Sequence, residues 1–126
     1  MHLLSLSLLL PLLTPTLALS NQTVLNNCTE PIFVTYLNST KSTHGPTQVN
    51  GTGGTWNSSI VGVGNSLGVS KSDQFWSKQT PKLILGASTD RGVLYWTVSS
   101  VDGDPFAGEK WRLESGEGNR CENATT

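Results

Sequence analysis

Apolar residues in this chain recur in short runs that alternate with polar residues, with a period close to two. The clearest runs cover residues 23–25, 32–37, 82–85, 92–98 and 110–113. Branched and aromatic side chains dominate these runs, which is typical of β-strands. A helical period is nearly absent, so the pattern predicts strands and not helices.

The segments between these runs predict turns and one long loop. Residues 38–55 are rich in Ser, Thr, Gly and Asn, and we expect an exposed loop there around one short strand near residues 48–49. Residues 56–63 and 67–71 flank Gly64-Asn65 and are expected to form a hairpin. Residues 89–92 should join the two strongest strands. About seven short strands predict one all-β domain, a sandwich of two antiparallel sheets.

The first 20 residues follow a different pattern. Leucines dominate residues 3–13, a stretch too short and too interrupted to span a bilayer, which takes about 20 apolar residues. Small residues at Ala18 and Ser20 favour cleavage. We therefore expect residues 1–20 to be a signal peptide that is removed, and residues 21–126 to be the mature domain. A retained membrane anchor is the alternative, because no Lys or Arg precedes the leucines.

Charge and composition narrow the classes of partner. The net charge is −1, only 13% of residues are charged, and no basic cluster occurs. We therefore expect neither nucleic acid nor an anionic membrane surface as a partner, and no membrane span in the mature chain. The expected state is a secreted monomer, outside the cell or in the cell wall, without a cofactor.

Export would expose the cysteines to an oxidising compartment and the Asn-x-Ser/Thr sites to glycosylation. In an oxidising compartment Cys28 and Cys121, near the two ends of the mature chain, are expected to pair, with a free-thiol role as the alternative. Six sites match the Asn-x-Ser/Thr acceptor rule for glycosylation: Asn21, Asn27, Asn38, Asn50, Asn57 and Asn123. Asn27 adjoins a half-cystine, whose oxidation competes with glycosylation.

The aromatic residues are assigned mainly to the core. Tyr95 and Trp96 are neighbours on one strand, so they should point to opposite faces. Trp56, Trp76 and Trp111 can line a sugar-stacking surface, but core filling is the favoured interpretation.

Two features suggest chemistry at first sight. Gly64-Asn65-Ser66-Leu67-Gly68 matches the G-x-S-x-G nucleophile pattern, but no histidine follows Ser66, and the expected context is a hairpin turn and not a strand-to-helix elbow. His44 has no partners of the right type for a metal site, and we expect a solvated loop histidine. We expect no metal.

The carboxylates of residues 102–109 are the candidate catalytic groups. Asp102, Asp104 and Glu109 could supply the pair of acids that a glycosidase needs, about 5 to 10 Å apart. A calcium site on the same oxygens is the other functional interpretation. Asp-Gly and Asp-Pro also favour turns, so a structural role is the first expectation.

Two segments carry a family resemblance. Residues 24–28 (VLNNC) with 31–34 (PIFV), and residues 95–108 (YWTVSSVDGDPFAG), resemble thaumatin-like proteins. The DGDPFAG ending is closer to their small fungal branch, the yeast-phase-specific secreted proteins. The resemblance implies a fungal secreted protein with a thaumatin-like β-sandwich. In larger members an acidic cleft binds or cleaves β-1,3-glucan. Here Thr97 stands where the motif usually has aspartate, and only Asp102 matches.

Three hypotheses for function follow. The leading one is a non-catalytic secreted protein that binds cell-wall glycan or a partner protein at the cell surface or host interface. The second is a weak β-1,3-glucan hydrolase or antifungal protein that uses the acidic residues. The third is an effector directed at a host protein.

Overall fold

The structure, a computed structural model, describes residues 20–114, 116 and 124–125. Nine strands lie in this part of the chain: β1 (Ser20–Asn26), β2 (Ile32–Leu37), β3 (Thr43–Val49), β4 (Gly54–Ile60), β5 (Asn65–Ser70), β6 (Lys82–Asp90), β7 (Val93–Val101), β8 (Arg112–Leu113) and β9 (Ala124–Thr125). None of the described residues is helical, and hence no helix among them could cross a membrane.

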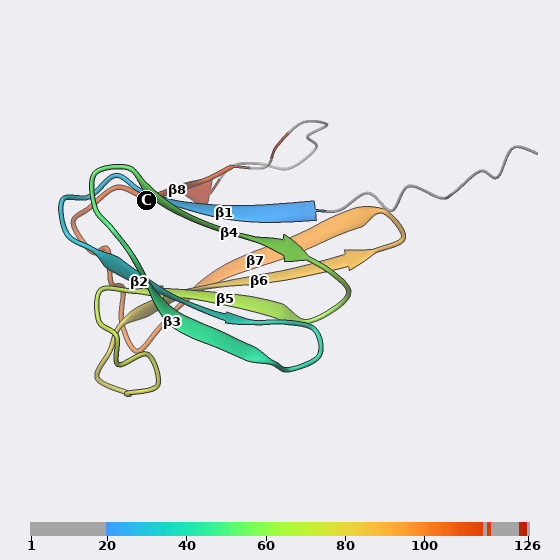
Figure 1. Ribbon diagram of the computed structural model, residues 1–126, viewed down its shortest axis with the longest axis horizontal. Helices are drawn as coiled ribbons and strands as arrows, with labels where there is room; N and C mark the ends of the chain where they lie inside the picture. Colours follow the sequence, from blue (N-terminus) through green and yellow to red (C-terminus); the bar gives the residue numbers. More distant parts are fainter. Residues whose placement is uncertain (1–19, 115, 117–123, 126) are drawn as a thin grey trace, which may run out of the picture.

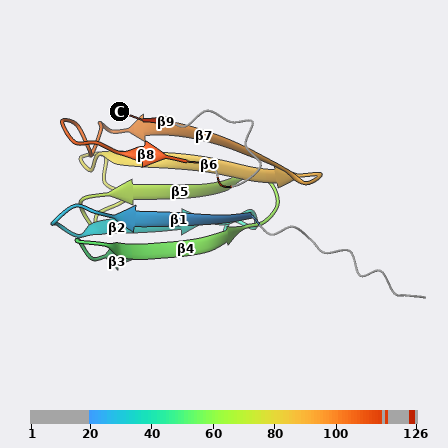
Figure 2. The ribbon, with the colours of Figure 1, turned by 90° about the horizontal axis from the view of Figure 1, so that it is seen from above.

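The strands form two layers. One layer is a five-stranded antiparallel sheet in the order β3-β2-β5-β6-β7. The other contains the pair β1-β4 and the short pair β8-β9, which lie on the same side of the large sheet (Figures 1 and 2). The all-β, two-layer prediction is therefore confirmed. The expected partner of Cys28 in a disulfide, Cys121, lies outside the described residues.

The predicted hairpin of residues 56–63 and 67–71 is wrong. β4 pairs with β1, and β5 pairs with β2 and β6, so the two strands belong to different layers. The chain crosses between layers at residues 61–64, where Gly62 and Gly64 adopt positive φ. The crossing is favoured because Trp56 and Ile60 of β4 face the interior from the small layer.

The predicted loop of residues 38–55 is also wrong in most of its length. It contains all of β3 and the first residues of β4, and only the strand near residues 48–49 was expected. β3 is an edge strand with every residue exposed except Val49, so it shows no apolar alternation that a sequence pattern could reveal. Its bulge opposite Thr35 requires Gly45, because a Cβ there would lie 2.4 Å from the carbonyl oxygen of Val34.

The core lies between the two layers. Val34, Tyr36 and Leu67 of the large sheet are at most 6% exposed. Val24 of β1 and Trp56 of β4 pack against them from the opposite layer. Burial of each such side chain stabilises the fold by about 1.5–3 kcal/mol relative to leaving it in water.

A buried amide connects the layers at one end. Asn26, 2% exposed at the end of β1, donates from Nδ2 to the carbonyl oxygens of Glu30 (2.9 Å) and Val49 (3.1 Å). Its Oδ1 accepts from the backbone N–H of Cys28 at 3.0 Å. Three hydrogen bonds therefore fix the turn after β1 against the end of β3.

Part of the outer face of the large sheet, over Gly68 of β5, is covered by the loop of residues 71–81. Phe75 packs over Gly68 of β5, where a Cβ would lie 2.1 Å from the Phe75 ring. Lys82, 6% exposed, donates to Asp102 Oδ2 at 2.7 Å and to the carbonyl oxygen of Ser77 at 3.1 Å, with its ammonium 5.6 Å from the Phe75 ring centre. These contacts hold the loop against the sheet.

The close approach at Gly68 gives a prediction for stability. Gly68→Ala should lower the free energy of unfolding by about 1–3 kcal/mol, because the new methyl group displaces Phe75. Urea unfolding of the mature protein measures the change, with Gly116→Ala, where the added Cβ meets nothing within 4 Å, as the control. A loss at Gly68 no larger than that at Gly116 would contradict the packing described.

Cys28 gives a second prediction, for the reduced protein. Its Sγ lies 3.6 Å from Glu109 Oε2; burial, this hydrogen bond and the charge of Glu109 raise the pKa of the thiol above its ordinary value. At pH 8 the thiolate fraction should be smaller than in an ordinary cysteine, and alkylation slower. Glu109→Gln should accelerate iodoacetamide labelling of Cys28, read by peptide mass spectrometry, whereas Glu30→Gln should not. Equal rates in all three proteins would refute this effect of Glu109.

Candidate functional site

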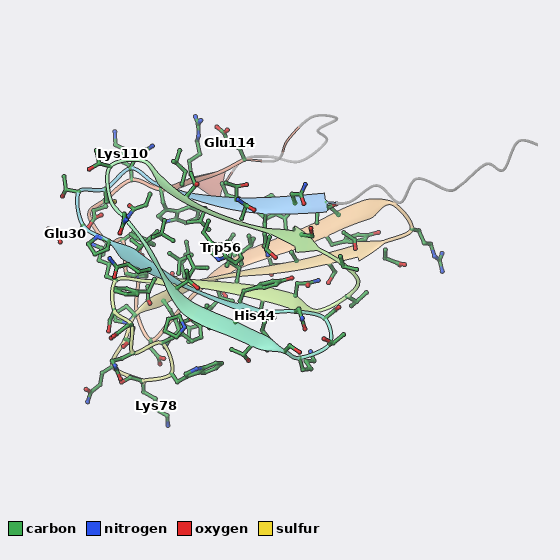
Figure 3. All side chains as sticks on the ribbon, in the orientation of Figure 1. Glu30, His44, Trp56, Lys78, Lys110 and Glu114 are labelled. Atoms are coloured by element: carbon green, nitrogen blue, oxygen red, sulfur yellow. The ribbon has the colours of Figure 1, made fainter. Side chains whose placement is uncertain are left out.

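A groove of about 460 Å3 opens where the ends of β2, β3 and β4 meet. Ring-bearing side chains line it together with small polar ones and one valine: Tyr36, Asn38, Ser39, Thr40, His44, Trp56, Ser58, Ser59, Val61 and Asn65. In Figure 3, Trp56 lies between β4 and the large sheet, and His44 lies on β3. Both layers therefore contribute to the groove.

Tyr36 and Asn65 form the base of the groove. The Tyr36 hydroxyl shares its proton between Asn65 Oδ1 at 2.7 Å and the carbonyl oxygen of Ser59 at 3.1 Å. Asn65, 3% exposed, donates from Nδ2 to the carbonyl oxygens of Val61 and Gly62, both at 3.1 Å. The contact connects β2, β4 and β5 and orients both side chains before any ligand binds.

The rings of the groove are fixed by one another. The Tyr36 ring lies 5.8 Å from that of Trp56 in an edge arrangement and 6.2 Å from that of His44, which it meets at 24°. Such pairs contribute about 0.5–1.5 kcal/mol beyond their burial. Tyr36 is buried and Trp56 half-buried, while His44 is exposed, so the imidazole is the ring most accessible from solvent.

The rim of the groove is neutral and hydroxyl-rich. Asn38 Oδ1 accepts from the backbone N–H of Thr40 and of Ser42 (both 3.0 Å) and from the Thr40 hydroxyl at 2.7 Å. These bonds fix the turn after β2. None of the described residues that line the groove is Asp, Glu, Lys or Arg. Its surface therefore favours a neutral, hydroxyl-rich ligand over an ion.

One buried amide next to the groove needs a partner. Gln22 of β1, 7% exposed, lies directly opposite the groove residue Ser58. Neither Oε1 nor Nε2 of Gln22 has a hydrogen-bond partner among the described residues. A buried amide in this state costs about 1–3 kcal/mol.

Trp76 lies on a different surface. It is 71% exposed in the middle of the 71–81 loop, with its ring 4.9 Å from the Phe75 ring in an edge arrangement. Figure 3 shows this loop, marked by Lys78, on the side of the molecule away from β1 and β4. The core-filling interpretation is wrong for Trp76, because Phe75 occupies the apolar site over Gly68. Trp56 and Trp111 pack against the core as expected.

Each of the predicted acidic residues has its own local partner. Asp102 accepts from Lys82, and Asp104 Oδ1 accepts from the backbone N–H of Phe106 at 2.9 Å. Glu109 pairs with Lys71, and this hydrogen bond is the largest influence lowering the pKa of the Glu109 carboxyl. None of the three lines the groove. No group of three or more His, Cys, Asp or Glu suited to a metal occurs among the described residues.

The two other sequence features lie in strands. Ser66, of the G-x-S-x-G match, belongs to β5 between β2 and β6, with no strand-to-helix elbow around it. His44 lies in β3 and not in a loop, although it is exposed as expected. Tyr95 is 57% exposed and Trp96 is half-buried, as expected of opposite faces of one strand.

The acceptor asparagines are accessible where the structure describes them. Asn21, Asn27, Asn50 and Asn57 are exposed, Asn38 is half-buried at the groove, and Asn123 lies outside the described residues.

The residues of the groove were only partly predicted from the sequence. Trp56 and His44 were singled out there, but not as neighbours in one site. Tyr36 and Asn65 were not predicted to be site residues. The position of Asn65, directly after a glycine between two strands, could have indicated a buried side chain that holds the turn.

Comparisons with known proteins agree with the fold. The family model described as Blastomyces yeast-phase-specific protein (Bys1) matches residues 9–126. The crystal structure of the protein elicitor MoHrip2 from Magnaporthe oryzae is similar, with a TM-score of 0.68 and 26% sequence identity over 84% of this chain and 76% of that chain. No curated protein sequence matches the chain.

The family match spans nearly the whole sequence and confirms the resemblance to the yeast-phase-specific proteins, whereas the resemblance to thaumatin-like proteins stays a prediction. This chain is a member of the Bys1 family.

Proposed function

We propose that this protein is a secreted, elicitor-like fungal protein that acts outside the cell by binding and not by catalysis. The observation that carries the proposal is its similarity to the elicitor MoHrip2, at 26% identity over 84% of the chain. The leucine-rich segment of residues 3–13 and the six glycosylation sites support export. The wider relation to thaumatin-like proteins remains a prediction from residues 24–34 and 95–108.

The groove is the contact surface that this function would use. It combines an exposed imidazole, the half-buried Trp56 ring and a rim of hydroxyl and amide groups, and none of its described lining residues is Asp, Glu, Lys or Arg. Sugars present an apolar C–H face and many hydroxyls, which match these two kinds of group. We therefore propose a neutral glycan as the ligand, on the fungal wall or on a host surface.

Catalysis is not part of the proposal. A glycosidase needs two carboxyl groups facing one sugar about 5 to 10 Å apart. Asp102, Asp104 and Glu109 are instead engaged with Lys82, the Phe106 backbone and Lys71, and none lines the groove.

Elicitor activity has a direct test. The mature, secreted protein applied to leaf discs should trigger an oxidative burst within the first hours, measured by luminol luminescence. The control is the same preparation unfolded by heat. A response equal to that control would overturn the elicitor-like proposal, whatever the groove binds.

The glycan-binding part has a separate test. Calorimetric titration with β-1,3-glucan, chitin and mannan oligosaccharides should show binding of at least one class. His44→Ala should weaken that binding about fivefold, the loss of roughly 1 kcal/mol of ring contact. Trp76→Ala removes a larger exposed ring outside the groove and should leave the affinity unchanged. If Trp76→Ala weakened binding and His44→Ala did not, the binding site would lie at the 71–81 loop. If no class of oligosaccharide bound, the proposal of a glycan ligand would be refuted.

A further inference from the structure

β7 is a long edge strand without any of the features that protect edges. Its sequence, VLYWTVSSV, contains no charge and no proline, and its register with β6 runs without a bulge from Lys82↔Val101 to Asp90↔Val93. Within the described part of the chain, β7 pairs with β6 alone. About half of its backbone N–H and C=O groups therefore point away from β6 toward an open edge.

The opposite edge of the same sheet provides an internal comparison. β3 contains Pro46, which has no N–H to donate, and a bulge opposite Thr35 that interrupts its register. Both features block the addition of a further strand. Among the described residues, the sheet is therefore protected at β3 and unpaired on the outer side of β7.

The side chains of β7 are suited to a partner strand. Val93, Tyr95 and Val101 on its outer face are 49%, 57% and 41% exposed. Gly86 of β6 leaves a second hollow of about 370 Å3 beside Tyr95 and Thr97. Branched and aromatic residues of this kind are the ones that form favourable cross-strand pairs.

We propose that β7 pairs antiparallel with β7 of a second copy, around a two-fold axis at Thr97. This register aligns all nine residues: Val93 faces Val101 of the partner copy, Tyr95 faces Ser99, and Thr97 faces its own equivalent. Each interface of this type is isologous, so the assembly closes as a dimer. The two five-stranded sheets become one continuous sheet.

The charges at the two ends of β7 are complementary in this arrangement. Arg91 precedes the strand, and Asp102 and Asp104 follow it. Both ends of β7 are turns, with φ of 51° at Arg91 and 57° at Asp102, and the antiparallel register brings the turn with Arg91 of one copy near the turn with Asp102 and Asp104 of the other, twice per dimer. Opposite charges at the ends favour this register over a shifted one.

The dimer goes beyond the proposed function, is independent of it, and replaces the monomer expected from composition and charge. The groove residues Tyr36 and His44 belong to β2 and β3, at the opposite edge of the large sheet from β7. Trp56 belongs to β4, in the other layer near that same edge (Figure 2). Both grooves would therefore stay open. Two linked sites would increase the avidity for a ligand with repeated units.

The oligomeric state tests the proposal. Sedimentation velocity of the mature, deglycosylated protein over a concentration series should show a monomer–dimer equilibrium. Thr97→Lys places like charges on the two-fold axis and should raise the dissociation constant about tenfold or more. Gln48→Lys, on the protected β3 edge, should not change it. A wild-type protein that is monomeric at every concentration would overturn the proposal, as would a dimer insensitive to Thr97→Lys.

Cross-linking tests the register with a smaller substitution. Thr97→Cys should form a reducible dimer on mild oxidation, because the two introduced thiols face each other. Ser99→Cys should not, since each thiol would face Tyr95 of the partner copy. Circular dichroism checks that both variants remain folded. Equal cross-linking of the two variants would contradict the axis at Thr97.

Discussion

The hydrogen bond of the buried Tyr36 hydroxyl is the interaction on which the candidate site depends. A hydroxyl between two packed layers must be paired, and Tyr36 meets this need with Asn65 Oδ1 and the carbonyl oxygen of Ser59. The bond spans the gap between layers and fixes how far β4 lies from β2. Asn65 in turn holds the crossing at Val61 and Gly62. The spacing and the ring positions of the groove follow from this contact.

A second constraint acts on the outer face of the same sheet. Gly68 leaves room for Phe75, and the buried ammonium of Lys82 connects Asp102 with the backbone at Ser77. These contacts direct Trp76 into solvent. Aromatic rings of the described residues therefore reach the surface in settings of different character, which include a lined groove between the layers and the exposed rings of Trp76 and Tyr95 elsewhere. The groove combines three rings with a hydroxyl-rich rim and is the larger of the two hollows described, and for this reason the proposed glycan contact is placed there.

The apolar pattern of the sequence predicts the strands that have one buried face. It does not predict a strand that is exposed on both faces, or which strand another one pairs with. β2, β6 and β7 carry apolar side chains at regular positions, so alternation was enough to find them. β3 is polar on both faces, and its place in the sheet depends on main-chain bonds to β2 that composition does not encode. The pairing of β4 with β1 was missed because residues 60–65 allow a hairpin locally, and only the burial of Trp56 and Ile60 against the other layer decides against it.

Nuclear magnetic resonance mapping of a bound oligosaccharide is the most direct test of the central claim, that the groove between the layers is the binding surface. Amide shifts should change around Asn38, His44 and Ser58, and the side-chain amide of Gln22, which lies opposite Ser58, should shift with them. Changes confined to residues 71–81, with the groove signals unmoved, would contradict it.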